Sequence, residues 1–446
     1  MSLAPEHPHR TVVPGPGGPA GLPPSDPRVR QALGLLSELL RPLGERPWSL
    51  ELWDGTVVPG SAPEPGLRIV LRHPAALRVL LVGRDAVSLA EAYLSGLLDL
   101  EGNLDLAFDI ARDLAAHPPS PRLAWRLGLL ALRLPRPPKP REGVAGGRAA
   151  LAGERHSKDR DAAAIRHHYD VGDDFYRVFL DERMVYSCAY WTREGMSLEE
   201  AQEEKLDLVC RKLGLGPGMR VLDIGCGWGS FVIFAAERYG VEAHGITLSR
   251  NQVETARRRI EAAGLADRVR VDLLDYRDLP TDGRYDRVVS IGMAEHVGRS
   301  MFPTYMEAAF RALRPGGLFL NHAIASRADT RPDSMTAFID RYVFPDGELL
   351  PPGFVLDAAE HASFEVLDVH GLRPHYARTL RAWVRRLERG RDRAIAAAGE
   401  RAWRLWRLYM AGCARAFSSG RVGVYQVLLA RRRPDGTHDA PEVRVV

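Results

Sequence analysis

The sequence predicts an α/β fold in which a parallel sheet is flanked by helices, together with a smaller α+β domain at the N-terminal side. Two observations carry this prediction. After about Ile165, strand patterns alternate with helix patterns of ten or so residues, and a glycine-rich turn follows the first of these strands. Strands separated by helices imply right-handed crossovers, which place helices on both faces of a parallel sheet.

The elements of this α/β region can be predicted in order along the chain. The segment LRPGGLFLNHAIA, beginning at Leu313, adds a turn and one more strand to the series. The remaining patterns predict strands at 220–224, 242–247, 269–273 and 285–291, and helices at 230–239 and 250–263.

Composition shifts divide the chain into five segments. The part before the linker mixes a helix pattern, VRQALGLLSELL, with a short strand pattern, LRIVLR, and is therefore expected to be α+β. The expected segments are a disordered tail at 1–27, an accessory domain at 28–134, a basic linker rich in proline and glycine at 135–160, the α/β domain at 161–434, and a C-terminal tail at 435–446.

Composition excludes several classes of protein. The 446 residues contain no run of about 18 uncharged apolar residues, and the N-terminal segment lacks the apolar core of a signal peptide. A protein that stays inside the cell is therefore expected. The four cysteines form no C-x-x-C pair, which predicts reduced thiols and no zinc knuckle or other metal site. A net charge of only +4 argues against a nucleic-acid partner.

The turn in VLDIGCGWGSF, residues 221–231, is the strongest local motif. Gly225, Gly227 and Gly229 leave the backbone bare where a strand meets a helix, so N–H groups can approach a ligand. A dinucleotide site or a tight packing turn could use the same glycines. With Asp223 before it and Trp228 inside it, the turn resembles the S-adenosylmethionine site of class I methyltransferases, which have a Rossmann-like fold. This resemblance implies that the turn holds the methionine and ribose parts of the cofactor.

Polar and aromatic residues follow the next two predicted strands. Thr247 and Gln252 lie within reach of the ribose, and Asp275 and Tyr276 are placed to accept from the adenine amino group and to stack on the purine. The alternative is that Thr247 caps a helix and Gln252 faces solvent.

Five sequence blocks narrow the resemblance to the cyclopropane-fatty-acid synthase family, from about Ile165 to Ala430. They are RHHYDVGDDFYRVFLDERMVYSCAYW, SIGMAEHVG, FLNHAIA, FIDRYVFPDGELLP and HYARTLRAW. AEAYLSGLLDLEGNLD, at Ala90 to Asp105, also resembles the N-terminal lipid-binding domain of that family. The resemblance adds Tyr169, Tyr186 and Ser187 to the cofactor-binding residues.

The family's reaction explains why a special site is needed. When a cis double bond attacks the sulfonium methyl group, positive charge appears on the acyl chain, and this carbocation must be kept from water. Aromatic rings can face it, and a base must then remove a proton. The resemblance implies that the base is a bicarbonate ion bound by Glu295 and His322, in a cage closed by Cys188, Ile324 and Tyr376.

Each of these residues also has a simpler interpretation. Taken alone, His322 could be a hydrogen-bonded core histidine, Cys188 a small buried apolar residue, and Glu295 the start of a helix. Cys188 is not expected to be a nucleophile, because no partner at readable spacing activates it. If Glu295 binds beside bicarbonate, the two acids share a proton and their titrations are coupled.

Four functions follow from these observations. The first is formation of a cyclopropane ring on an unsaturated phospholipid acyl chain. The second is a 10-methylene or 10-methyl branch of the tuberculostearate type, in which a separate reductase would act on the methylene product. A methyltransferase for small molecules, with an N-terminal domain that serves only dimerisation, and a non-catalytic binder are further alternatives.

A phospholipid acceptor implies a cytoplasmic enzyme held at the inner face of the membrane, and a homodimer would strengthen that attachment. In PRLAWRLGLLALRLPRP, Arg122, Arg126 and Arg133 fall within about 40° of each other on a helical wheel, beside an apolar face. This pattern suits an anionic membrane surface, although a core helix with one solvent-exposed edge would have a similar sequence. In the arginine-rich C-terminal region, the tryptophans expected to pack on the catalytic core are Trp383, Trp403 and Trp406.

Overall fold

The computed structural model describes residues 26–44, 46–60, 64–82, 86–138, 151–169, 171–330 and 334–441. Most of the predicted N-terminal tail, part of the predicted linker and the last five residues of the C-terminal tail lie outside these ranges. The chain divides into two compact units. One contains the N-terminal region with the short segments 333–338 and 404–412, and the other contains the rest of the chain.

The N-terminal unit is α+β, as predicted. Its sheet has the order β2-β1-β3-β4, in which β1 and β3 are parallel and the other pairs antiparallel. Its strands are β1 (Trp48–Glu51), β2 (Val57–Pro59), β3 (Leu67–Leu71) and β4 (Leu98–Gly102). Its helices are α1 (Pro27–Leu40), the 3-10 helix η1 (Arg41–Leu43), α2 (Pro74–Val82), α3 (Ala86–Leu94), α4 (Leu104–Ala116) and α5 (Pro121–Leu132).

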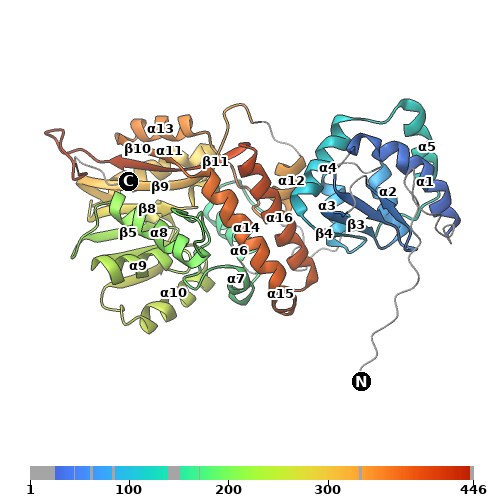
Figure 1. Ribbon diagram of the computed structural model, residues 1–446. Helices are drawn as coiled ribbons and strands as arrows, with labels where there is room; N and C mark the ends of the chain where they lie inside the picture. Colours follow the sequence, from blue (N-terminus) through green and yellow to red (C-terminus); the bar gives the residue numbers. More distant parts are fainter. Residues whose placement is uncertain are drawn as a thin grey trace, which may run out of the picture. The chain divides into compact units, whose positions relative to one another are not determined.

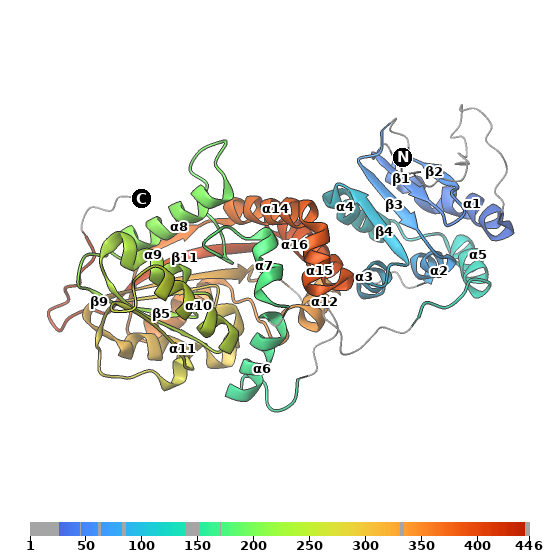
Figure 2. The same cartoon turned by 90° about the horizontal axis from the view of Figure 1, so that it is seen from below.

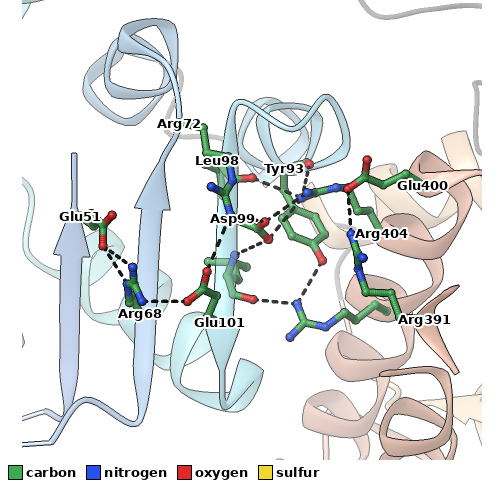
Figure 3. Close-up of polar contacts among 12 residues, drawn as sticks. Glu51, Arg68, Arg72, Tyr93, Leu98, Asp99, Glu101, Arg391, Glu400 and Arg404 are labelled. Atoms are coloured by element: carbon green, nitrogen blue, oxygen red, sulfur yellow. Dashed lines mark hydrogen bonds and ion pairs between the residues drawn. The ribbon is translucent and has the colours of Figure 1, made fainter. Parts of the chain in front are cut away.

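Two arginines of α16 (Glu400–Ser418) complete this unit (Figure 3). Both are 5% exposed. Arg404 forms an ion pair with Asp99 at 3.2 Å and donates to the carbonyl of Tyr93 at 3.3 Å. Arg407 donates to the Tyr93 hydroxyl at 3.1 Å and to the carbonyl of Leu100 at 3.0 Å. The turn between α3 and β4 is thus held by hydrogen bonds to buried guanidinium groups, which would be costly to leave unpaired.

The second unit is built on a sheet of order β10-β11-β9-β8-β5-β6-β7 (Figure 1). The strands predicted at 220–224, 242–247, 269–273 and 285–291 are confirmed with these bounds as β5, β6, β7 and β8. β9 (Leu313–Ser326) extends the parallel series. β11 (Val422–Ala430) differs, because it lies antiparallel between β9 and β10 (Glu365–Gly371) and makes the sheet mixed.

Helices cover both faces of this sheet, and each face has its own apolar core. These helices are α8 (Leu198–Lys212), α9 (Ser230–Tyr239), α10 (Arg250–Ala262), α11 (Gly298–Ala312) and α13 (Pro352–His361). Apolar side chains of α8, α9 and α10 pack on one face, and those of α11 and α13 pack on the other.

The remaining α-helices and 3-10 helices lie outside the sheet. The helix α7 packs against α14 and α15 (Figure 2). The elements are α6 (Lys158–Tyr169), α7 (Asp173–Phe179), η2 (Tyr276–Asp278), η3 (Ala294–His296), α12 (Ser334–Tyr342), α14 (Arg373–Arg389) and α15 (Arg391–Ala398).

Three further predictions can be compared with the structure. All four cysteines are free. Trp383, Trp403 and Trp406 are at most 7% exposed, but Trp406 lies in the segment that belongs to the N-terminal unit, whereas Trp383 and Trp403 lie in the second unit. Among the described residues, none of the helices combines the length and apolar character that crossing a bilayer requires.

Candidate active site

The glycine turn follows β5 and has a backbone conformation that favours glycine. Gly225 and Gly229 both have left-handed backbone, with φ of 86° and 79°. A side chain on Gly225 would bring its Cβ within 2.8 Å of the Cβ of Met293. On Gly229, the cap of α9, the Cβ would lie 3.2 Å from the Cβ of Ala256. Gly225 therefore allows close approach at the strand end, and Gly229 allows α9 and α10 to pack.

A cavity opens beside this turn, and its lining is formed by the ends of strands, by the glycine turn and by residues of α6. The predicted cofactor-binding residues that line it are Tyr169, Gly225, Gly227, Thr247, Gln252 and Tyr276. Those that do not line it are Tyr186, Ser187, Asp223, Gly229 and Asp275.

A buried hydrogen bond connects the side chains of Thr247 and Gln252. The Thr247 hydroxyl donates to Gln252 Oε1 at 2.7 Å, and Gln252 is 3% exposed. The residue that caps α10 is Ser249, whose side chain accepts from the backbone of Gln252 at 3.3 Å. The alternative in which Thr247 caps the helix and Gln252 faces solvent is therefore wrong.

Asp275 binds a neighbouring arginine and does not line the cavity. Its carboxylate accepts from the Arg277 guanidinium at 2.7 and 2.6 Å, and the same guanidinium reaches Asp161 of α6 at 3.0 Å. Arg277 and Asp161 line the cavity, whereas Asp275 does not. Asp275 thus orients Arg277, and Asp161 is the carboxylate that faces the cavity. That Asp275 accepts a hydrogen bond directly from the adenine amino group stays a prediction.

Glu295 of η3 is hydrogen-bonded to β9, the strand that carries His322. Glu295 Oε1 accepts from the backbone N–H of Ile324 at 2.7 Å. Two buried atoms, Glu295 Oε2 and His322 Nε2, have no hydrogen-bond partner in the described part of the chain. Unpaired buried polar atoms are costly, so their presence marks a place prepared for a ligand.

The protonation of both residues follows from their surroundings. Burial raises the pKa of Glu295 to about 7. Burial, assisted by the positive charges of Lys205 and Lys212, lowers the pKa of His322 well below its usual value. Gln426 Nε2 donates to His322 Nδ1 at 3.3 Å, which leaves the proton of the neutral ring on Nε2. His322 therefore presents a neutral N–H donor at its unpaired atom.

Cys188 and Tyr376 lie beside this pair. Burial raises the pKa of the Cys188 thiol, which agrees with the expectation that it is not a nucleophile. The pKa of Tyr376 is raised by burial and then by Cys188 and Glu295, so these three groups are electrostatic neighbours. The structure thus brings the five predicted cage residues to one region, while their individual roles stay predictions.

An aromatic cluster is in contact with Tyr376. The rings of Tyr186 and Trp383 stack at 5.2 Å, and those of Tyr176 and Trp228 lie 4.9 Å apart. Tyr376 lies 6.1 Å from Trp383 in an edge-to-face arrangement. The faces of aromatic rings are negative and can attract positive charge.

Sequence reasoning missed several residues of this site. Asp161 comes from α6, whose sequence gave no site signal. Gln426 is the one amide in the apolar run VGVYQVLLA, and Lys205 is one of only four lysines in the chain, so both carried a signal that could have been noticed.

The sheet, the left-handed glycine turn and the cavity at the strand ends, together with the similar solved structures, identify a class I S-adenosylmethionine-dependent methyltransferase. Residues 156–427 match the family model described as mycolic acid cyclopropane synthetase, and the chain belongs to this family. The resemblance inferred from the sequence blocks is thereby confirmed.

Three similar proteins show how far the likeness extends. A probable fatty acid methyltransferase of Pseudomonas putida is 41% identical over 401 residues, covering 89% of this chain and 95% of that protein. A cyclopropane-fatty-acyl-phospholipid synthase of Escherichia coli (strain K12) is 35% identical over 383 residues, covering 86% and 92%. The crystal structure of mycolic acid cyclopropane synthase CmaA1 complexed with SAH and CTAB is 36% identical, covers 60% of this chain and 97% of that chain, and has a TM-score of 0.57.

The glycine turn can be tested by substitution. We expect Gly225→Ala to weaken binding of S-adenosylmethionine about tenfold or more, because the new Cβ would displace Met293 at the cavity wall and strain the backbone. Gly264→Ala is the matched control, since Gly264 has φ of 67° but faces open space. Calorimetric titration of both variants measures the effect, and equal affinities would contradict it.

The pKa of Glu295 predicts a pH dependence of stability. Its folded value of about 7 exceeds the usual 4.5, so the stability it contributes is complete below pH 4.5 and is lost as pH rises through 7. Burial also raises the pKa of Asp223 to about 7, so Asp223 adds to this loss of stability. We therefore expect Glu295→Gln to lose less stability than the wild type between pH 4.5 and 8. Urea midpoints across this range measure it, with exposed Glu307→Gln as control, and parallel curves for wild type and Glu295→Gln would refute it.

Proposed function

We propose that the protein transfers a methylene carbon from S-adenosylmethionine to the cis double bond of an unsaturated phospholipid acyl chain, forming a cyclopropane fatty acid. The observation that carries the proposal is the pair of unpaired buried atoms, Glu295 Oε2 and His322 Nε2, in a region that also holds an aromatic cluster. S-adenosylmethionine, when bound, supplies an electrophilic methyl group.

The chain's own residues perform three tasks in this proposal. Gly225 and Gly227 hold the cofactor at the strand ends through exposed backbone. Tyr186, Trp383 and Tyr376 exclude water, and their rings face the positive charge that develops on the acyl chain. These tasks need no covalent bond between the protein and the substrate.

The residues present fit a bound bicarbonate ion. His322 offers an N–H donor at Nε2. Glu295, with a pKa of about 7, is about half protonated at neutral pH, and its protonated form can donate from Oε2, because Oε1 already accepts from Ile324. Two donors in one region suit an oxyanion. Bicarbonate held there would supply a base in a place that water does not reach.

The second candidate is a methylene or methyl branch on the acyl chain. It is supported by the 41% identity to a protein named as a probable fatty acid methyltransferase, against 35% for the one named as a cyclopropane-fatty-acyl-phospholipid synthase. Both products start from the same carbocation, and a branch product would require a separate reductase to become saturated. A small-molecule substrate is less favoured, because it would not need the water-free aromatic surroundings.

The N-terminal unit provides a surface suited to membrane contact. Along α5, Leu123 and Leu127 are buried, so one face of the helix packs in its own unit. The other face leaves Trp125 67% exposed and Leu132 73% exposed, among the exposed side chains of Arg122, Arg126 and Arg133. Aromatic and apolar groups among basic side chains are typical of helices that lie in an anionic membrane surface. We propose that α5 binds the cytoplasmic leaflet, and a homodimer would double this contact.

The reaction can be tested with purified protein, S-adenosylmethionine and vesicles of monounsaturated phospholipid. Proton NMR of the fatty acids should show high-field cyclopropyl signals. Vinylidene signals would instead establish the branch product, and the mass alone would not distinguish them. Glu295→Gln and His322→Ala should keep cofactor affinity within about twofold and lose turnover by about 100-fold or more, which is the scale of a lost acid–base group. Near-normal turnover in both variants would refute the assignment of the base site.

Membrane contact can be tested by vesicle flotation at low salt. Combined Arg122→Glu and Arg126→Glu should weaken binding to vesicles containing anionic lipid, because each basic side chain near the surface contributes about 1 kcal/mol. The control has the same charge change on the catalytic unit, Arg268→Glu with Arg311→Glu, where both arginines are exposed. Unchanged flotation of the α5 variant would assign that helix a purely structural role.

A further inference from the structure

Helix α14 has two faces of opposite character. An α-helix turns by about 100° per residue, so Tyr376, Trp383 and Leu387 fall within about 40° of one another. Trp383 and Leu387 are at most 1% exposed, so this face packs inside the second unit. The opposite face carries four arginines within about 80°. They form the basic stripe, which consists of Arg378, Arg381, Arg385 and Arg389.

Positive charge is concentrated along the basic stripe. Partial desolvation lowers the pKa of Arg385, and the positive charges of Arg389, Arg381 and Arg378 lower it further. The negative charge of Glu388 acts in the opposite direction and does not offset this shift. Like charges three or four residues apart, as in this stripe, destabilise a helix. An anion bound beside the stripe would relieve this repulsion.

Two members of the basic stripe are available to such an anion. Arg385 and Arg389 are exposed, and in the described part of the chain neither forms a hydrogen bond or an ion pair. Arg386, which lies beside the stripe on the same helix, shows the contrast. It forms an ion pair with Glu199 at 2.6 Å. The charges of Arg385 and Arg389 therefore point to a partner outside the chain.

The other two members of the basic stripe are held by their neighbours. The guanidinium group of Arg378 lies over the ring of Trp191, 4.1 Å from its centroid. Trp191 is partly exposed, and its Nε1 donates to Thr379 Oγ1 at 3.1 Å. Arg381 donates to Ser418 Oγ at 2.8 Å. An indole ring among basic side chains is typical of protein surfaces that meet the headgroup region of a bilayer.

We propose that the basic stripe binds the phosphate groups of phospholipids at the surface of an anionic bilayer. The planar guanidinium group matches pairs of phosphate oxygens. A phospholipid joins an anionic phosphate to an apolar chain, and α14 presents positive charge on one face and the rings of Tyr376 and Trp383 on the other. The inference rests on the phospholipid acceptor of the proposed function. It adds a lipid contact on the second unit to the contact proposed for α5.

The first test measures binding without catalysis. The full chain is floated at low salt, without S-adenosylmethionine, with vesicles of monounsaturated phosphatidylcholine and phosphatidylglycerol. Arg385→Gln combined with Arg389→Gln should weaken binding about tenfold, because basic side chains near an anionic surface are attracted to it. High salt should reduce the difference between this variant and the wild type. Arg389→Gln alone, with a smaller loss, provides the test if the double variant does not fold.

Two further double variants separate charge from other effects. Arg385→Lys combined with Arg389→Lys keeps the charge and should bind within about threefold of the wild type. Arg268→Gln combined with Arg311→Gln is the matched control, because both arginines are exposed on the second unit away from α14. The control should float as the wild type does.

A second readout uses turnover on the same vesicles with S-adenosylmethionine. In the Arg385→Gln and Arg389→Gln double variant, the lipid concentration for half-maximal rate should rise about tenfold, whereas kcat and cofactor affinity should stay within about twofold. This pattern is expected of a surface that collects the substrate and takes no part in the chemistry.

Four results would overturn the proposal. They are unchanged flotation of the glutamine double variant, an equal loss in the control, a lysine variant as weak as the glutamine variant, and a loss of the same size on vesicles of phosphatidylcholine alone. Unchanged flotation with a smaller mass by light scattering would assign the stripe to a contact between copies of the chain. If the wild type floats with anionic vesicles but forms no modified lipid, the proposed function fails while the binding surface stands.

Discussion

The exclusion of water from polar groups at the carboxyl ends of the strands is the constraint on which this site depends. Glu295, His322, Asp223 and Lys205 are all shielded from solvent, and in each case burial is the largest influence on the pKa, shifting it toward the neutral form. In such surroundings hydrogen bonds and charges act more strongly than in water. Glu295, His322 and Asp223 each keep one buried polar atom without a hydrogen-bond partner in the described part of the chain. A loss of stability in exchange for function is typical of active sites.

The architecture explains how these groups are brought together without water. Parallel strands deliver their loops to one edge of the sheet, so Asp223 and Glu295, 72 residues apart in the sequence, share that edge. The antiparallel β11 adds Gln426 directly opposite His322, which sets the tautomer of the ring. The aromatic side chains come from α7 and α14, from the segment between α7 and α8 that carries Tyr186, and from the glycine turn, so the aromatic cluster and the polar groups are supplied by different parts of the chain.

Much of this could be predicted from sequence, because the relevant signals are local. The strands at 220–224 and 285–291 and the glycine turn depend on hydrophobic period and on backbone conformation, which neighbouring residues determine. The direction of β11, the pairing of Gln426 with His322 and the approach of Asp161 to the cavity depend on contacts between distant segments. The sequence around Asp275 did not reveal that its carboxylate would bind Arg277 rather than face the ligand, since both arrangements use the same residues.

Exclusion of water is a requirement that the two candidate products, a cyclopropane ring and a methylene branch, have in common. Ring closure and branch formation both begin with a cation on the acyl chain, so both need the water-free aromatic surroundings and both need a base near Glu295 and His322. In the proposed reaction the products differ in whether a hydride shifts along the acyl chain to the cation before the transferred methyl group loses a proton. Without the shift a ring closes, and with it a methylene branch forms, so both routes pass a proton to the same base. We infer that product choice depends on how the acyl chain lies against the rings of Tyr186, Trp383 and Tyr376, so substitutions of these rings, rather than of the polar cage, are expected to change the product.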